Sequence, residues 1–415
     1  MRKLPPALIL AATQVIVEGA TFLRNIVLAR IIGVENMGLA VAVAIGVRLF
    51  EMIGDFGLER WLVQVKAERL PRIRGAVHLL QAIKGVLLMA AAMAVAIPVT
   101  RLLLPEVEAS VFALAAIAIG IRGFINYDYR ERHRERDYRG SLRVEAGSNL
   151  LALLATAPIA LWTRDYSAVA WASIMQALAM CLLSQWVARR HMSFTCNRQA
   201  IAEALRFGIP ISCNALLMFL ALQGDRLIVA VHFEPETLAG FALAAQLTLL
   251  PALAGTRFIM GFDLPKYAEA VNSGSTWQAL LRKRLFQVTA VSGAMVLAFS
   301  IVGQNLVSGL YGPEFVTEAG VLELLALAAG IRLTRTVPST MLVAQGRTPY
   351  LLACNMPRVL ALMAVIWALG QGAGLFAVAL IGVVSEATGL MIGLAALHGT
   401  DRPRHTLMHP TAGAS

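Results

Sequence analysis

The stretches QVIVEGATFLRNIVLAR, residues 14–30, and RLFEMIGD, residues 48–55, decide how this chain folds. Each belongs to an apolar run long enough to cross a bilayer as a helix, yet each carries ionisable side chains where charge is costly. These side chains are Glu18, Arg24 and Arg30 in the first run, and Arg48, Glu51 and Asp55 in the second. Such groups usually face a protein interior or a water-filled cavity, so the two runs predict a transport pathway.

The composition of the whole chain agrees with a membrane protein. Of its 415 residues 58% are hydrophobic and 15% charged, and the mean hydropathy is +0.68. This is too apolar for a soluble enzyme and predicts an all-α polytopic membrane protein with about twelve transmembrane helices. The predicted spans lie near 7–31, 37–58, 76–99, 107–126, 144–163, 167–188, 207–232, 237–262, 286–309, 318–337, 349–369 and 373–397.

Basic residues alternate between the loops and set the orientation. The loops on one side hold most of the arginines and lysines, whereas the opposite loops hold only Arg101 and Arg164. By the positive-inside rule this predicts that both termini are cytoplasmic. The basic cytoplasmic segments are Arg2 with Lys3, 59–75, 130–143, 189–206, 264–284, Arg335 with Arg347, and Arg402 with Arg404.

The chain also resembles itself at a shift of about 202 to 210 residues. Arg24-Asn-Ile-Val aligns with Arg226-Leu-Ile-Val, and Ile121-Arg122 aligns with Ile331-Arg332. Repeats of six helices each share one orientation, with a substrate site expected between them. We therefore predict two pseudo-symmetric six-helix bundles. Their boundaries would be an N-terminal lobe at 1–190, a cytoplasmic linker at 191–206, a C-terminal lobe at 207–398 and a cytoplasmic tail at 399–415.

Four segments in order along the chain resemble the polysaccharide transporter branch of the multidrug/oligosaccharidyl-lipid/polysaccharide (MOP) exporter superfamily, which holds the oligosaccharide flippases. They are Arg24-Asn-Ile-Val-Leu-Ala-Arg30-Ile-Ile-Gly33, Asp55-Phe-Gly-Leu58 with Gln64, Gly224-Asp-Arg-Leu-Ile228, and Leu310-Tyr-Gly-Pro-Glu-Phe315 followed by Leu322 to Ala329. The resemblance implies two bundles with alternating access. It also implies a transporter, not an enzyme, in the bacterial inner membrane.

The cargo implied by the resemblance is an undecaprenyl-pyrophosphate-linked oligosaccharide for a surface polysaccharide such as the O-antigen of lipopolysaccharide. The implied partners are this lipid-linked oligosaccharide and membrane lipids. A glycan polymerase or glycosyltransferases are further candidate partners, and no nucleic acid is expected.

Pyrophosphate needs cations that stay charged in a partly desolvated cavity, and guanidinium groups do so with donors matched to phosphate oxygens. The candidate substrate-binding residues are therefore Arg24, Arg48, Arg226, Arg257, Arg332 and Arg358. The similar lipid-linked peptidoglycan precursor flippases also place cations on the first, second and eighth spans. The structural alternative for each arginine is a carboxylate partner, such as Glu51 one turn after Arg48. Arg30 and Lys84, nearer span ends, are expected to snorkel.

Four carboxylates are candidates for coupling transport to a proton or Na⁺: Glu18, Glu51, Asp55 and Asp263. The alternative is that they serve as counter-ions of the arginines. Glu386, on the last span, is expected to be an interhelical hydrogen-bond partner. We predict no cofactor and no metal site. Without a Walker motif, ATP is not expected to be the direct energy source.

Three segments between spans invite other interpretations. Residues 59–75 and 264–284 look amphipathic and are expected in the membrane interface, with Trp61 and Trp277 as anchors. Residues 127–139 mix basic and aromatic side chains, a pattern also found in RNA-binding proteins. Their position between two spans favours a cytoplasmic loop that lies against anionic lipid head groups.

Other functions compete with a lipid-linked oligosaccharide flippase. A cation-coupled multidrug antiporter of the same superfamily would need a cavity dominated by carboxylates, whereas arginines outnumber acids on the polar spans. A membrane-embedded glycan polymerase or ligase would need a sizeable outward loop, and the predicted outward loops are short. A non-transporting scaffold in a glycan assembly complex is left open by the sequence.

Overall fold

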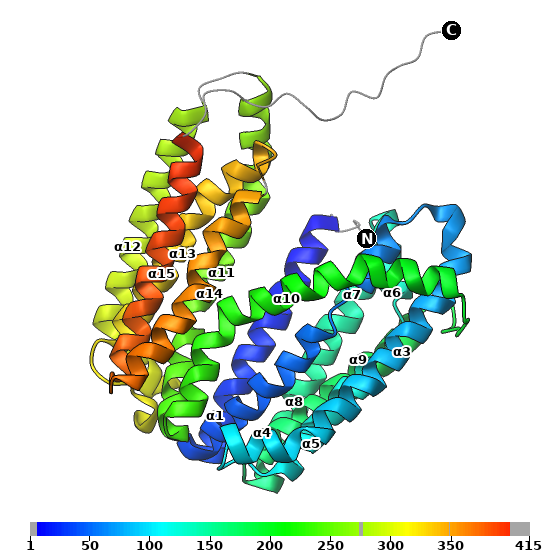
Figure 1. Cartoon of the computed structure of the whole chain (residues 1–415), viewed down its shortest axis with the longest axis horizontal. Helices are drawn as coiled ribbons and strands as arrows, with labels where there is room; N and C mark the ends of the chain where they lie inside the picture. Colours follow the sequence, from blue (N-terminus) through cyan, green and yellow to red (C-terminus); the bar gives the residue numbers. More distant parts are fainter. Residues whose placement is uncertain (1–5, 274–276, 348, 399–415) are drawn as a thin grey trace, which may run out of the picture. The chain divides into compact units, whose positions relative to one another are not determined.

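The computed structural model describes residues 6–273, 277–347 and 349–398, and every regular element in these ranges is helical (Figure 1). Arg2, Lys3, Arg402, Arg404 and the predicted tail at 399–415 lie outside the described residues. The long helices are α1 (Pro6–Ile53), α3 (Leu70–Ala94), α5 (Ala109–Arg122), α8 (Gly147–Thr163), α9 (Ser167–Val187), α10 (Arg198–His232), α11 (Pro235–Asn272), α12 (Trp277–Leu310), α13 (Val321–Ala344), α14 (Pro349–Gly370) and α15 (Leu375–His398). Shorter helices are α2 (Leu58–Gln64), α4 (Ala96–Leu103), α6 (Asp128–Glu131) and α7 (Arg139–Ser141).

All twelve predicted spans coincide with helices. Within the described ranges nine helices are long and apolar enough to cross a membrane. The first of these carries two predicted spans, because α1 changes direction at Gly33, whose φ of 79° favours glycine. Helix α5 is only 14 residues long, and arginines and hydroxyl side chains lower the hydropathy of α13, so neither is among the nine. The predicted class, an all-α polytopic membrane protein with about twelve transmembrane helices, is confirmed.

The first of two compact units runs through Leu243 and includes Asn305–Thr317. Helix α1 contacts α8, α9 and α10, while α5 contacts α3 and α9 (Figure 1). Small residues allow α3 and α5 to approach closely, since a Cβ on Gly85 would lie 2.7 Å from Cα of Gly123. Helix α10 contacts α1 and α3 in this unit, although its residues from 207 on were assigned to the C-terminal lobe. The predicted lobe boundaries stay a prediction.

The second unit comprises Ala244–Gln304 and the described chain from Glu318 on. Helix α15 contacts both α13 and α14, and Tyr267, Val337 and Met341 are fully buried in the core of the unit. Large apolar side chains are exposed in both units, as expected for lipid contact. Examples are Leu154 and Trp162 in the first unit, and Phe286, Met363 and Trp367 in the second.

The two segments expected in the membrane interface lie partly in these cores instead. In the first unit Trp61 is buried and its ring lies 6.3 Å from that of Phe207 on α10. In the second unit Leu281 is buried in the core and Trp277 packs against it. The expectation was wrong for Trp61, because an amphipathic pattern shows that one side is apolar but not whether protein or lipid covers that side. For the partly buried Trp277 it stays a prediction.

Candidate functional site

In the first unit, Glu51 holds two arginines together. Its Oε2 lies 2.7 Å from Nη1 of Arg48, one turn away on α1, and its Oε1 pairs with Nη1 of Arg122 at the end of α5. The Glu51 side chain is 12% exposed, whereas that of Arg48 is 55% exposed. One buried carboxylate therefore neutralises only one of the two arginines, and Arg48 remains accessible.

A third arginine, Arg24, belongs to the same cluster but has a neutral partner. Its Nη1 donates to Oε1 of Gln176 on α9 at 3.1 Å. The charges of Arg24 and Arg48 both act on Arg122. In the part of the chain that the structure describes, Arg24 forms no ion pair with a carboxylate. Three arginines are thus set against Glu51 and the charge of Asp55, which acts on Arg48, so positive charge is in excess.

The other predicted residues of the first unit lie in smaller groups. Nη1 of Arg226 donates to Oε1 of Gln223 on α10 at 2.8 Å. Asp55 accepts from the backbone N–H of Gly57 at 3.2 Å and lies 3.8 Å from Nη2 of Arg60. Glu18 is half-buried on the same half of α1 as Arg24.

Arg30, which was expected only to snorkel, donates from Nε to the Leu310 carbonyl at 2.9 Å. A cation at that position is favourable because it caps the carboxyl end of α12.

In the second unit three arginines converge on Glu386. Its Oε1 lies 2.7 Å from Nε of Arg332 on α13 and 3.1 Å from Nη1 of Arg358 on α14. Its Oε2 lies 3.4 Å from Nε of Arg335. The three arginine side chains are 10% to 14% exposed and Glu386 is 1% exposed. Glu386 on α15 is therefore an interhelical partner, as predicted, and it brings together two of the predicted arginines.

The sequence counted Arg335 among the basic residues on the cytoplasmic side, and this orientation stays a prediction. Helix α13 continues to Ala344, so Arg335 lies inside it, where Nη1 donates to the Cys354 carbonyl at 2.5 Å. A Cβ at Gly389 would lie 2.9 Å from that Nη1 and 2.5 Å from that carbonyl oxygen. Only glycine leaves room for the guanidinium, which explains how a charged residue fits so near the end of a span.

Asp263 and Arg257 also belong to the second unit. Oδ1 of Asp263 accepts from Nε and Nη2 of Arg284 at 3.0 and 2.6 Å, and the Asp263 side chain is 1% exposed. Arg257 is exposed on α11. The structure thus brings Arg24 and Arg48 together in one unit, and Arg332 and Arg358 in the other.

Sequence reasoning missed three residues of these clusters: Arg122, Arg335 and Gln176. The repeat contained one signal, because it aligned Ile121-Arg122 with Ile331-Arg332 and both arginines bind a buried glutamate. Gln176 carried no comparable signal, since a single amide in an apolar span indicates neither its partner nor its role.

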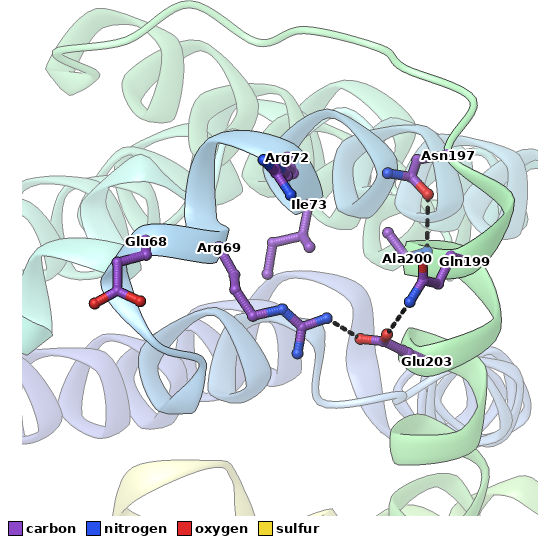
Figure 2. Close-up of a pocket in the computed structure, with 8 residues that line it drawn as sticks. All are labelled: Glu68, Arg69, Arg72, Ile73, Asn197, Gln199, Ala200 and Glu203. Atoms are coloured by element: carbon purple, nitrogen blue, oxygen red, sulfur yellow. Dashed lines mark hydrogen bonds and ion pairs between the residues drawn. The ribbon is translucent and has the colours of Figure 1, made fainter.

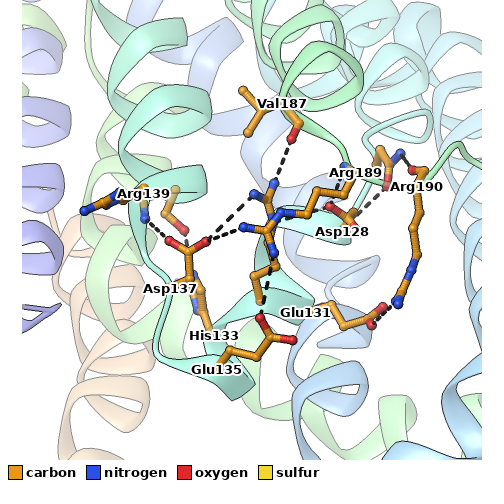
Figure 3. A network of polar contacts seen from close by, with 12 residues as sticks. Asp128, Glu131, His133, Glu135, Asp137, Arg139, Val187, Arg189 and Arg190 are labelled. Carbon is orange, nitrogen blue, oxygen red and sulfur yellow. Dashed lines mark hydrogen bonds and ion pairs between the residues drawn. The ribbon is translucent and has the colours of Figure 1, made fainter.

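The basic loop after α5 is folded against its own unit (Figure 3). Arg74 on α3 binds Glu131 with two hydrogen bonds of 2.8 and 2.7 Å, and Arg190 lies 3.1 Å from the same carboxylate. Arg132 pairs with Asp128 at 3.3 Å and donates to the Val187 carbonyl at 2.8 Å. Many of the arginines expected at lipid head groups are therefore held by acids and carbonyls of the protein.

A pocket of about 570 Å³ lies where α3 and α10 begin (Figure 2). Arg69 and Glu203 pair across it at 2.6 Å, and Asn197 caps α10 by accepting from the Ala200 N–H at 3.1 Å. Its charged lining residues are Glu68, Arg69, Arg72 and Glu203. Because acids and bases balance there, the pocket has no preference for an anion, unlike the arginine clusters.

Comparison with known proteins gives the family. The sequence model of the polysaccharide biosynthesis protein family matches residues 27–320, more than half of the chain. A Klebsiella pneumoniae protein described as "uncharacterized membrane protein in cps region" is 18% identical over 391 residues, which cover 92% of this chain and 77% of the relative.

Solved structures share the fold. A lipid II flippase MurJ in an inward closed conformation superposes with a TM-score of 0.73 at 11% identity, covering 93% of this chain and 87% of the other. An inward-facing multidrug resistance MATE transporter of the MOP superfamily has a TM-score of 0.70 at 15% identity, covering 91% and 94%. At these identities the likeness shows the fold alone. It confirms the predicted class of two pseudo-symmetric bundles.

These findings confirm the resemblance to a polysaccharide family seen in the sequence, and together with the apolar helices they confirm a multi-pass membrane protein. The chain belongs to the polysaccharide biosynthesis protein family.

Proposed function

We propose that this protein is a flippase that moves a polyprenyl-pyrophosphate-linked oligosaccharide across the bacterial inner membrane for surface polysaccharide biosynthesis. The observation that carries the proposal is the pairing of Arg48 and Arg122 with the one carboxylate of Glu51, together with Arg24, whose contact is the neutral amide of Gln176. A pyrophosphate linker is negatively charged on both phosphates, and guanidinium groups are suited to bind it through paired hydrogen bonds.

In this proposal Arg24, Arg48 and Arg257 bind the pyrophosphate while the polyprenyl chain stays in lipid. Arg226, Arg332 and Arg358 are further candidates for contact with the cargo. The two lobes would alternate access to a cationic cavity, as expected for transporters built from parallel repeats. Both termini would be cytoplasmic, and a glycan polymerase or glycosyltransferases would supply or use the cargo.

Coupling to a proton or Na⁺ through Glu18, Glu51, Asp55 or Asp263 remains part of the proposal. The contacts of two of these carboxylates favour the counter-ion role, because Glu51 binds Arg48 and Asp263 binds Arg284.

The test measures binding of undecaprenyl pyrophosphate and of tetraphenylphosphonium to the purified full chain in lipid nanodiscs. We expect preference for the anionic lipid and about tenfold weaker binding in each of Arg24→Ala, Arg48→Ala and Arg257→Ala, which corresponds to one lost charge-assisted contact. Arg101→Ala, at an exposed position on α4, is the matched control and should bind like the wild type.

A cation-coupled multidrug antiporter is the second candidate, supported by the fold shared with a MATE transporter. Preference for tetraphenylphosphonium, with binding retained in the three arginine variants, would overturn the flippase proposal in favour of the antiporter. Transport assays in reconstituted vesicles with the same variants would then show whether binding leads to movement across the bilayer.

A further inference from the structure

Arg24 ends a chain of hydrogen bonds that crosses three helices of the first unit. Oε1 of Gln176 on α9 accepts from Arg24 at 3.1 Å. Nε2 of Gln176 donates to Oδ1 of Asn149 on α8 at 2.9 Å. Nδ2 of Asn149 donates to the backbone carbonyl of Glu145 at 2.8 Å. Two side-chain amides therefore connect the guanidinium to a backbone carbonyl.

The direction of this chain is fixed at both ends. Arginine can only donate and a carbonyl can only accept, so each amide must present its oxygen toward Arg24 and its NH₂ toward Glu145. Reversing either amide would bring two donors or two acceptors together. The amide orientations, which distances alone leave ambiguous, are thus determined by the partners.

The far end of the chain is anchored firmly. Glu145 lies in the π-helical turn η3 (Leu142–Ala146) that precedes α8, and its carbonyl also accepts from Oγ of Ser148 at 3.1 Å. Its buried carboxylate lies 3.2 Å from Nη2 of Arg130 in the basic loop. Isolated π-helical turns often mark functional positions in helices.

An amide oxygen orients a guanidinium without cancelling its charge. Arg48 and Arg332 are instead bound by carboxylates, which orient and neutralise at once. We propose that Gln176 and Asn149 are positioning residues that hold Arg24 in place with its full positive charge available for an anionic group of the cargo, a diphosphate. This inference rests on the proposed function.

The test compares binding of undecaprenyl pyrophosphate to full-length variants in nanodiscs. We expect Gln176→Leu and Asn149→Leu to weaken binding about five- to tenfold, because Arg24 loses its fixed position. Gln176→Glu should weaken binding as much as Arg24→Ala, since a carboxylate at this distance neutralises the arginine. Gln185→Leu is the matched control, because Gln185 on the same helix donates at 3.1 Å to the Phe124 carbonyl instead of contacting an arginine.

A double-mutant cycle separates positioning from a merely structural role. If Gln176 acts through Arg24, Gln176→Leu has no further effect on binding in an Arg24→Ala background. The positioning role would be overturned if Gln176→Leu weakened binding equally in both backgrounds. It would also be overturned if Gln176→Leu bound like the wild type while Arg24→Ala bound weakly. Either result would leave the proposed function intact. Unchanged binding by Arg24→Ala would instead refute the proposed binding site itself. Thermal unfolding of each variant identifies any loss of folded protein.

Discussion

The Glu51 cluster of the first unit and the Glu386 cluster of the second use the same components differently. In each, a buried glutamate is shared by more than one arginine. Arg48 in the first cluster is 55% exposed, whereas the three arginines of the second are at most 14% exposed. The same ion-pair chemistry is thus open in one unit and enclosed in the other.

This difference teaches that an arginine within a membrane span does not by itself indicate a binding site. Arg122 and Arg332 occupy corresponding positions in the repeat, but their glutamates lie on the second and the last spans. Exposure separates the two clusters, because the arginines of the second are enclosed, whereas Arg48 in the first is accessible to a ligand.

Removing the shared carboxylate of the second unit is expected to have the largest effect. Glu386→Gln leaves three enclosed arginines without a counter-ion, and breaking such a buried arrangement costs about 3–5 kcal/mol of unfolding free energy. Thermal and denaturant unfolding of the detergent-solubilised protein measures this cost. Glu318→Gln, at an exposed position, should change stability little. A loss as small as that of the control would show that Glu386 does not hold the second unit together.

Removing one arginine from the same cluster should cost less. Arg358→Met keeps most of the side-chain volume and reduces repulsion with Arg332 and Arg335, while Glu386 retains two partners. We expect a loss of about 1–2 kcal/mol in unfolding free energy, attributable to the lost ion pair between Arg358 and Glu386. Unfolding experiments on Arg358→Met and Glu386→Gln side by side give the comparison. If the arginine variant were the less stable of the two, the carboxylate would not be the centre of the cluster.

In the first unit the equivalent change should affect binding more than stability. Glu51→Gln removes the counter-ion of Arg48 and Arg122, but accessible arginines can be solvated, so the expected loss of stability is only about 1 kcal/mol. Binding of undecaprenyl pyrophosphate should become about three- to tenfold tighter, because two cations are released. Abolished binding would instead show that Glu51 has a direct part in the transport cycle.

Hydropathy predicted the helices well because each span must satisfy its backbone hydrogen bonds internally, which leaves helices as the solution. The arginine positions were also visible, since charge stands out in an apolar run. The partners were not, because a glutamate such as Glu386 meets arginines far away in sequence, and the exposure of Arg48 depends on tertiary packing. Trp61 shows the same limit, because its amphipathic helix faces protein where lipid was expected.

The smallest expected effect is a pH dependence of stability that arises in the basic loop of the first unit. His133 lies 2.7 Å from Oγ of Ser141, and burial, with the nearby charge of Arg130, lowers the pKa of His133 to about 4, against the opposing effect of Asp137. The unfolded chain binds this proton near pH 6.5, so stability is fully present above that pH and declines as the pH falls from about 6.5 to 4.

Because the ring is only partly buried, solvent screening should limit the loss to about 1 kcal/mol or less. His133→Gln, which cannot take up the proton, should flatten the decline in unfolding temperature between pH 7 and pH 4.5, whereas His191→Gln on the exposed linker should retain it. An identical decline in the His133→Gln variant would locate the acid sensitivity outside this loop.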